Sequence, residues 1–277
     1  MSDLSKLPRP VFVSNDPTAR VADFIARYQA DTGKILYPAQ PERLLIDLIA
    51  YADANLRAAI QYAGEQNLLA YAEGAALDNL GAFFNVTRLA GETDAALRER
   101  TRLAPEAFSV AGPAGAYRYF ALSAHPDVSD AYADSPAPGI VRVTVLSKTG
   151  LPTQSVLDAV QSACSAEIAR PLCDTVQTAA PSPVDYTLTA QIQPSAGFTQ
   201  ALIEPAVTAA ANTYAAGKSA RLGSDITRSQ IMAALNAIPG VHRVAALTSP
   251  ASDLILTRLQ WARCTGVTLT WLAASDE

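Results

Sequence analysis

The most regular hydrophobic pattern in the chain runs from about Glu42 to Glu73, a stretch without proline. Its apolar and small residues are spaced alternately by four and three, which places them on one face of an α-helix and is typical of helix-to-helix packing. Such a helix would span about 45 Å, more than a domain of ~100 residues with a radius near 13 Å can cover. The residues on this face are Leu45, Ile49, Ala52, Leu56, Ala59, Ala63, Gln66 and Ala70. The pattern fits a helix that meets another chain, and it also fits an ordinary core helix with an alanine-rich stripe.

Shorter elements surround this long helix. Residues 1–20 are polar and contain three prolines, so we expect an extended arm that is not packed. A helix is predicted over Val21–Thr32, where Gly33 stops it. We expect Gly74 to end the long helix.

Two further helices are predicted before residue 109. The first covers Leu77–Phe84, and we expect its large apolar side chains, Phe83 and Phe84 included, to point inward. The second covers Ala95–Ala104, with Thr93 and Asp94 as its cap.

The pattern changes after the small, flexible stretch Ser109–Gly115, which we interpret as a domain boundary. Beyond it, β-branched runs alternate with helical patterns, and Pro181 and Pro183 mark a second boundary. The expected helices are 116–124, 154–168, 200–216 and 228–238, and the expected strands are 128–133, 140–146, 175–178, 186–192, 241–247 and 254–259. The helix, turn and strand around Ser135-Pro136-Ala137 are echoed around Ser249-Pro250-Ala251, which hints at two similar units.

These elements predict an α+β fold, in which an N-terminal helical domain with one long helix is followed by two small α+β domains. The predicted division is an arm over 1–20, a helical bundle-forming domain over 21–108, a central α+β domain over 116–180 and a C-terminal α+β domain over 184–277.

Charge and targeting patterns narrow the class of protein. The 21 basic and 26 acidic residues give a net charge of −5 without a basic arm, which argues against a nucleic-acid-coating protein. The first twelve residues lack the apolar core of a signal peptide, and no apolar run reaches the ~18 residues that a membrane helix needs. We therefore expect a chain that folds in a reducing cytoplasm, or leaves it by a route that needs no signal.

The residues that usually carry chemistry are few and scattered. The chain has two histidines and three cysteines, without a zinc-ligand spacing, and the usual nucleotide, protease and hydrolase motifs are absent. We expect reduced, mostly buried thiols and no catalytic, cofactor-binding or metal site. Asp127, Asp130 and Asp134 cluster at a strand, and a solvated strand face explains them better than a cation site does. The chemistry-bearing residues are His125, His242, Cys164, Cys173 and Cys264.

The two tryptophans near the end of the chain leave two interpretations open. Trp261 could anchor an interface, where tryptophan is enriched, or it could close the local core.

Several runs of the sequence resemble the baseplate J-like proteins. Residues 70–88 (AYAEGAALDNLGAFFNVTR) and 92–100 (ETDAALRER) are similar to the signature of that family. Residues 104–117 (APEAFSVAGPAGAY) and 135–139 (SPAPG) are similar to its phage-tail members. The resemblance extends over nearly the whole chain.

This resemblance implies a structural baseplate wedge protein of a contractile phage tail or a pyocin-like particle. Two copies would associate with one smaller wedge protein through a shared bundle of N-terminal helices. The C-terminal parts would meet neighbouring wedges in a ring around the hub, beside the sheath-initiating baseplate proteins, and the ring would widen when the sheath contracts. The protein would be assembled in the host cytoplasm and end in the virion, without enzymatic activity or contacts to nucleic acid or membrane. The interface residues would be Leu45, Ile49, Ala52, Leu56, Ala59, Ala63 and Trp261.

A second class of function stays open beside this one. A small soluble α+β enzyme with a carboxylate or thiol site of an unrecognised kind would also fit the composition. Self-association and dependence on a partner favour the structural class, whereas a fixed particle size and a polar pocket favour the enzyme.

Overall fold

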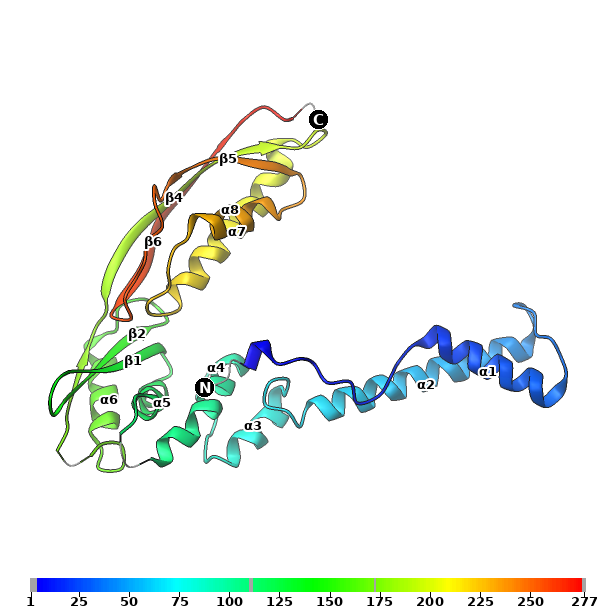
Figure 1. The fold of residues 1–277 in the computed structure, drawn as a ribbon, viewed down its shortest axis with the longest axis horizontal. Helices are drawn as coiled ribbons and strands as arrows, with labels where there is room; N and C mark the ends of the chain where they lie inside the picture. Colours follow the sequence, from blue (N-terminus) through cyan, green and yellow to red (C-terminus); the bar gives the residue numbers. More distant parts are fainter. Residues whose placement is uncertain (1–3, 110–111, 172, 276–277) are drawn as a thin grey trace. The chain divides into compact units, whose positions relative to one another are not determined.

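The computed structural model describes residues 4–109, 112–171 and 173–275. The chain forms two compact units, one of residues 1–88 and 92–102, the other of residues 89–91 and 103–277 (Figure 1). Helices make up the first unit and two small sheets with their helices the second, so the predicted α+β fold is confirmed.

The first unit begins with a pair of packed helices, α1 (Pro17–Thr32) and α2 (Pro41–Glu65). Helix α1 starts four residues earlier than predicted, because the Asp16 carboxylate accepts the backbone N–H of Ala19 and Pro17 occupies the first turn. It ends as predicted at Gly33, whose φ of 71° suits glycine.

Helix α2 is shorter than predicted, and Gln66 and Ala70 lie beyond it. It ends at Glu65 after 25 residues, or about 37 Å at 1.5 Å per residue. The chain then turns, with the Asn67 side-chain amide donating to the carbonyl of Ala63 at 2.8 Å. Arg98, from a later helix, donates to the carbonyls of Leu69 at 2.8 Å and Ala72 at 2.7 Å. Because these bonds come from distant sequence, the helical pattern of residues 66–73 did not reveal the turn.

The start of the next helix and the two phenylalanines that follow it also differ from the prediction. Helix α3 covers Gly74–Ala82, so Gly74 begins a helix rather than ending one. Leu77 is buried as expected, but the side chain of Phe83 is 83% exposed and Phe84 is exposed as well. Both phenylalanines follow the last helical residue, so the helical period no longer determines where they point.

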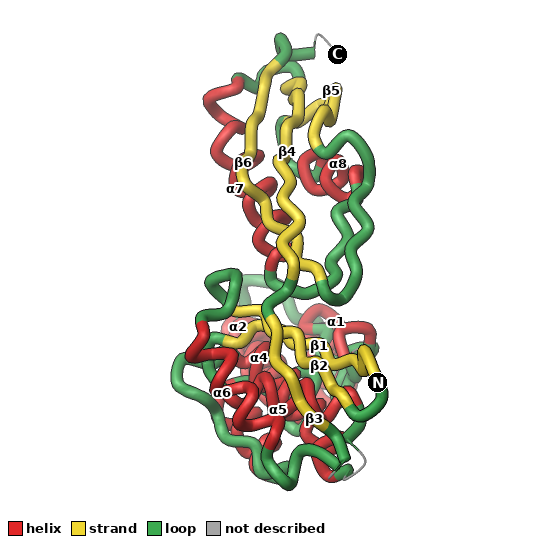
Figure 2. The backbone as a smooth tube through the Cα atoms, turned by 90° about the vertical axis from the view of Figure 1, so that its left-hand side faces the viewer, coloured by secondary structure: helices red, strands yellow, loops and turns green. Residues whose placement is uncertain are grey.

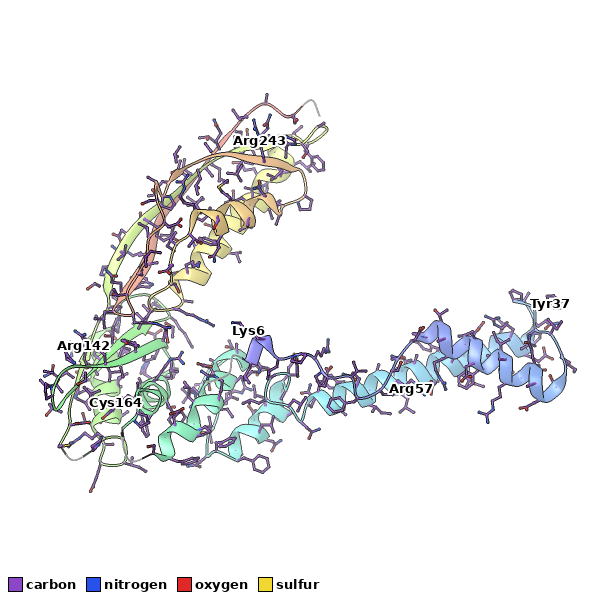
Figure 3. The ribbon with its side chains drawn as sticks, viewed as in Figure 1. Lys6, Tyr37, Arg57, Arg142, Cys164 and Arg243 are labelled. Carbon is purple, nitrogen blue, oxygen red and sulfur yellow. The ribbon has the colours of Figure 1, made fainter. Side chains whose placement is uncertain are left out.

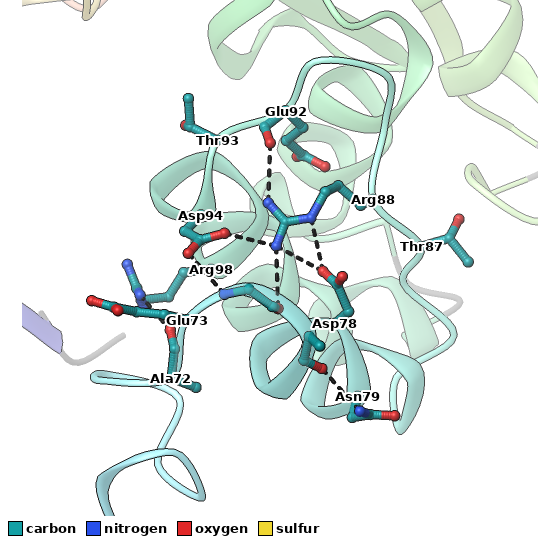
Figure 4. A network of polar contacts seen from close by, with 12 residues as sticks. Ala72, Glu73, Asp78, Asn79, Thr87, Arg88, Glu92, Thr93, Asp94 and Arg98 are labelled. Atoms are coloured by element: carbon teal, nitrogen blue, oxygen red, sulfur yellow. Dashed lines mark hydrogen bonds and ion pairs between the residues drawn. The ribbon is translucent and has the colours of Figure 1, made fainter. Parts of the chain in front are cut away.

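An arginine-centred network joins α3 to helix α4 (Asp94–Leu103) (Figure 4). The Arg88 guanidinium pairs with Asp78 and Asp94 at 2.7 Å each and donates to the carbonyl of Glu92 at 3.0 Å. Asp94 also accepts the backbone N–H of Gly74 at 3.0 Å. These bonds lower the pKa of the Asp94 carboxyl, the Gly74 bond most and the Arg88 bond next. The network fixes how α3 and α4 cross.

The arm that precedes α1 differs from the predicted extended, unpacked arm over 1–20: it contains a short 3₁₀ helix at Leu4–Lys6, has no helix or strand only over residues 7–16, and is packed along α2. The backbone N–H of Phe12 donates to the Gln61 side chain at 2.9 Å, and that side chain donates to the carbonyl of Pro10 at 2.8 Å. Arg9 forms two bonds to the Glu65 carboxylate, at 2.6 and 2.8 Å. The Phe12 ring lies so close to Gly64 that a Cβ there would be 2.6 Å from it. Glycine at this position therefore admits the arm.

The first sheet of the second unit has the strand order β1-β2-β3, built from β1 (Val128–Ala137), β2 (Ile140–Ser147) and β3 (Thr175–Ala179). Strand β2 pairs antiparallel with β1 and parallel with β3. Helices α5 (Ala114–Ala124) and α6 (Gln154–Ser165) pack against this sheet, after a short 3₁₀ helix at Ala104–Phe108. Tyr117, Val143, Val145 and Val160 lie in its buried core.

The second sheet has the order β5-β4-β6, built from β4 (Ser182–Pro194), β5 (Val241–Ser249) and β6 (Gln260–Trp271) (Figure 2). Its central strand also has one antiparallel and one parallel neighbour, although the strands follow a different chain order. Helices α7 (Gln200–Ser219) and α8 (Arg228–Asn236) lie against strands of this sheet. Leu188, Ile192, Val207 and Leu235 belong to its core.

The last strand was misplaced by the sequence pattern. Residues 254–259 are not a strand, and Leu254 forms only a single bridge to Ile226. The last strand is β6. Its alternation of buried and exposed residues is interrupted by a bulge near Gly266 and by polar residues on its exposed side. The Pro183 boundary signal lies inside β4, next to its first residue. Of the predicted Ser109–Gly115 boundary, residues 110–111 lie outside the described residues.

The Arg9–Glu65 contact predicts how acid affects the arm. Hydrogen bonds from Arg9, and then from Gln61, lower the pKa of the Glu65 carboxyl from 4.5 to about 2. A carboxyl whose pKa is lower in the folded state stabilises that state above its unfolded pKa, and the stabilisation is lost as the pH falls toward the folded pKa. In an NMR titration we expect the Glu65 carboxyl carbon to titrate near pH 2, and nearer its ordinary value in Arg9→Gln. A normal Glu65 titration with Arg9 present would contradict the arm contact.

A second prediction concerns the buried pair between Arg100 and Glu92, whose side chains are each 5% exposed and 2.6 Å apart. Removing one partner of a buried pair leaves a charge without its counter-ion, which costs about 3–5 kcal/mol. We expect Arg100→Ala to lower the urea midpoint of the first unit strongly. The control is Arg43→Ala, which breaks a more exposed pair with Asp47 in the same unit and should cost about 0–1 kcal/mol. Equal effects of the two variants would show that the Arg100 pair does not stabilise the fold.

Candidate assembly surface on the long helix

One side of α2 packs within the unit and the other is open. Ile46, Ala50 and Ala54 are buried on the packed side. The six predicted interface positions of this helix lie together on the opposite side, and all are exposed; they are Leu45, Ile49, Ala52, Leu56, Ala59 and Ala63. The side chains of Leu45, Ile49 and Leu56 are 59%, 56% and 60% exposed. The alternative of an ordinary core helix therefore does not describe this face, while its role as an interface stays a prediction.

A second apolar stripe lies beside the first and was missed by the sequence reasoning. Leu44, Leu48, Tyr51 and Tyr62 are all exposed, at spacings of four, three and eleven that keep them on one side of the helix. Each lies about 100° around the helix from a member of the first stripe, because each directly precedes one in the sequence. The spacing of these residues is visible in the sequence, but a heptad pattern that follows one stripe of the helix does not include a second stripe beside it. We call the two stripes together the open face of α2.

Charge is kept away from the open face. Within the described length of α2, the charged residues are Glu42, Arg43, Asp47, Asp53, Arg57 and Glu65, which fall on the other side or at the ends of the helix. Asp53 pairs with Arg57 at 2.7 Å and with Arg20 of α1 at 3.0 Å, and its pKa is lowered, mainly by the bond from Arg57. Arg57 is labelled on α2 in Figure 3. The Asp53–Arg20 pair therefore joins α2 to α1, and the open face carries no charge; Asn55, which is exposed between Leu48 and Tyr62, is polar.

The open face is unusual for a protein that works alone. Single exposed apolar residues are common, whereas a contiguous apolar surface rimmed by polar groups marks a contact with another molecule. Along α2 the exposed side mixes leucine, isoleucine and tyrosine with alanine. The small alanines would let a second helix approach closely, and the large residues would supply buried area.

Trp261 is the remaining predicted interface residue. It lies in a buried cluster within the second unit. Its side chain packs with Leu146 and Leu222 and is 7% exposed. The indole N–H donates to the carbonyl of Ser219 at 2.8 Å. The structure therefore favours the interpretation that Trp261 closes the local core, and its ring is not available as an exposed anchor.

The chemistry-bearing residues stay apart. The ring of His125 accepts the N–H of Asp127 at 3.1 Å through Nδ1, and His242 is exposed on β5. Cys164 is buried, which raises the pKa of its thiol to about 12, whereas Cys173 is exposed, contrary to the expectation of mostly buried thiols. Asp130 and Asp134 pair with Arg118 and Arg142. Among the described residues, no cluster of three or more His, Cys, Asp or Glu side chains could hold a metal ion.

The described residues also establish two further features, the absence of a membrane-spanning helix and the presence of an open hollow beside the arm. In the part of the chain that the structure describes, no helix combines the length and the apolar character needed to cross a membrane. An open hollow of about 400 Å³ lies between the arm and the end of α2, where Arg9, Glu65 and Arg98 line it. These side chains already bond to one another or to backbone carbonyls.

Comparison with known proteins connects the chain to one family along most of its length. Three family models match in order: the Baseplate J-like N-terminal domain at residues 40–93, the Baseplate J-like central domain at 109–180 and the Baseplate J-like C-terminal domain at 186–270. The first of these matches includes α2 and its open face.

A phage protein gives the same relationship. The chain is 31% identical over 290 residues to baseplate protein J of Escherichia phage P2, covering 95% of each. A chain in the cryo-EM structure of the anti-feeding prophage baseplate is 16% identical and gives a TM-score of 0.46. That match covers 62% of this chain and 41% of the other. On the strength of the three family models and the phage P2 relative, the chain belongs to the baseplate J-like family.

Proposed function

We propose that this protein is a structural component of a contractile-tail baseplate and acts as a wedge subunit. Membership of the baseplate J-like family supports a baseplate component. The observation that carries the finer proposal is the open face of α2, which is apolar, exposed and free of charge within the described helix. A subunit whose long helix is complete only in a bundle with other helices is built for assembly.

The proposed partners of the open face are a second copy of this chain and a smaller wedge protein. Two adjacent stripes can each receive one helix, since a helix that packs on two neighbours needs a wide apolar face. Leu45 and Leu56 represent one stripe, and Leu48 and Tyr62 the other. This geometry supports a bundle of three or more helices over a simple pair.

The C-terminal sheet is proposed to join neighbouring wedges into the ring. Strands β5 and β6 flank β4, so each leaves one edge without a neighbour in the described sheet. An open strand edge is a template for pairing with another chain. The sequence pattern predicted a strand at 254–259, and in this proposal the open edge belongs to β6 instead. Trp261 is buried and stabilises the sheet from its core.

The remaining parts of the proposal follow from this role. The subunit is located in the tail baseplate of the virion, is assembled in the host cytoplasm, surrounds the hub and changes arrangement when the sheath contracts. It has no catalytic role. The alternative of a small enzyme is not favoured by the described carboxylates and thiols, which pair with arginines or lie on separate elements.

A charge placed on the open face tests the proposal. We expect Ala59→Glu and Ala63→Glu to stop co-purification with the smaller wedge protein and with a second copy of the chain. A carboxylate buried without a partner costs about 3 kcal/mol or more, which is roughly a hundredfold in Kd. The matched control is Ala26→Glu on the exposed side of α1, beside Asp23 and Arg27, where the charge stays in water.

The readout is pull-down together with the circular dichroism of each variant. All three variants should keep the helical content of the wild type, because the substituted alanines are exposed in the isolated chain. Normal assembly of both Ala59→Glu and Ala63→Glu would show that the open face is not the bundle surface. Loss of assembly in Ala26→Glu as well would show that the effect does not belong to that face.

A further inference from the structure

The two sheets of the second unit are connected by a very short link. Strand β3 ends at Ala179 and β4 begins at Ser182, so only Ala180 and Pro181 separate them, and Pro181 is buried. A link of this length limits how far the sheets can separate, but it does not by itself prevent rotation about the connection.

An apolar contact closes the space beside this link. Trp261 at the start of β6 packs with Leu222 of its own domain and with Leu146 of β2, which is fully buried. The indole edge also lies over Gly150, where an added Cβ would be only 2.9 Å from the ring. Gly150 has a φ of +112°, so it serves both the turn after β2 and the close approach of the ring.

A polar contact lies next to the apolar one. The carboxylate of Asp130 in β1 accepts the backbone N–H of Leu222, which follows α7, at 3.0 Å. The same carboxylate accepts from Arg118 of α5 at 3.0 Å, and Asp130 is only 6% exposed. A side chain of the central sheet domain therefore satisfies a buried backbone donor of the C-terminal one. Leaving that donor unpaired carries the full cost of its desolvation.

We propose that Asp130 and Trp261 lock the central and C-terminal sheet domains into one rigid body. The contact combines a well-packed aromatic ring with a directional, charge-assisted bond, so rotation about residues 180–181 would break both at once. In an assembly, any displacement at one sheet would then be carried to the other undiminished. This inference concerns the isolated chain and stands whether or not the proposed wedge function is correct.

A distance measurement between the two domains tests the lock. Spin labels are placed at Ser155→Cys on α6 and Thr213→Cys on α7, both exposed, in full-length chain with Cys173 and Cys264 replaced by serine. Cys164 is buried and stays unlabelled. We expect a single narrow distance distribution in this background. Asp130→Ala and Trp261→Ala should each broaden it, with secondary structure retained by circular dichroism.

The matched control is Asp134→Ala. Asp134 also lies on β1 and pairs with an arginine, Arg142 of β2 at 2.6 Å, but that pair lies within the central sheet domain. We expect the control to leave the distribution narrow. A broad distribution before any substitution, narrow distributions in both lock variants, or equal broadening in the control would overturn the proposal. Broadening in only one lock variant would overturn the part assigned to the other residue.

Discussion

The structure depends on a helix that its own unit does not cover. Helix α2 has apolar residues on nearly all sides, but α1 and the arm occupy only one of them. The ion pairs of Asp53 and the arm contacts of Gln61 and Glu65 all lie on the packed side. Burying the open face against another molecule would remove apolar surface from water, the main favourable term in protein association.

The polar contacts of the first unit set the length and direction of this helix. Arg98 holds the turn that follows α2 by two backbone carbonyls, and Arg88 holds α3 against α4. These arginines lie within the runs that resemble the family signature. Their role is structural, because each bonds to backbone or carboxylate groups of the same unit. The signature therefore describes how the long helix is joined to the rest of the chain.

Much of this arrangement could be predicted from the sequence, since periodicity reports local structure. The heptad spacing identified the six exposed positions of α2, and the β-branched runs identified β2. The end of α2 could not be found in this way, because Arg98 stabilises the turn from about thirty residues away. Local periodicity also could not decide whether Trp261 is buried, because its burial depends on Leu146 in another sheet. Strand β6 was missed because it joins β4, its partner across some eighty residues, with a bulge and few alternating apolar side chains.

The most direct test of the account asks whether the open face of α2 is covered in an assembled particle. Ala52→Cys would be reacted with a maleimide in the isolated chain and in assembled baseplates, in the background lacking Cys173 and Cys264. Ala22→Cys, exposed on α1, reports on general access. We expect both thiols to react in the isolated chain, and we expect assembly to protect position 52 far more than position 22. Equal reactivity of position 52 before and after assembly would contradict it.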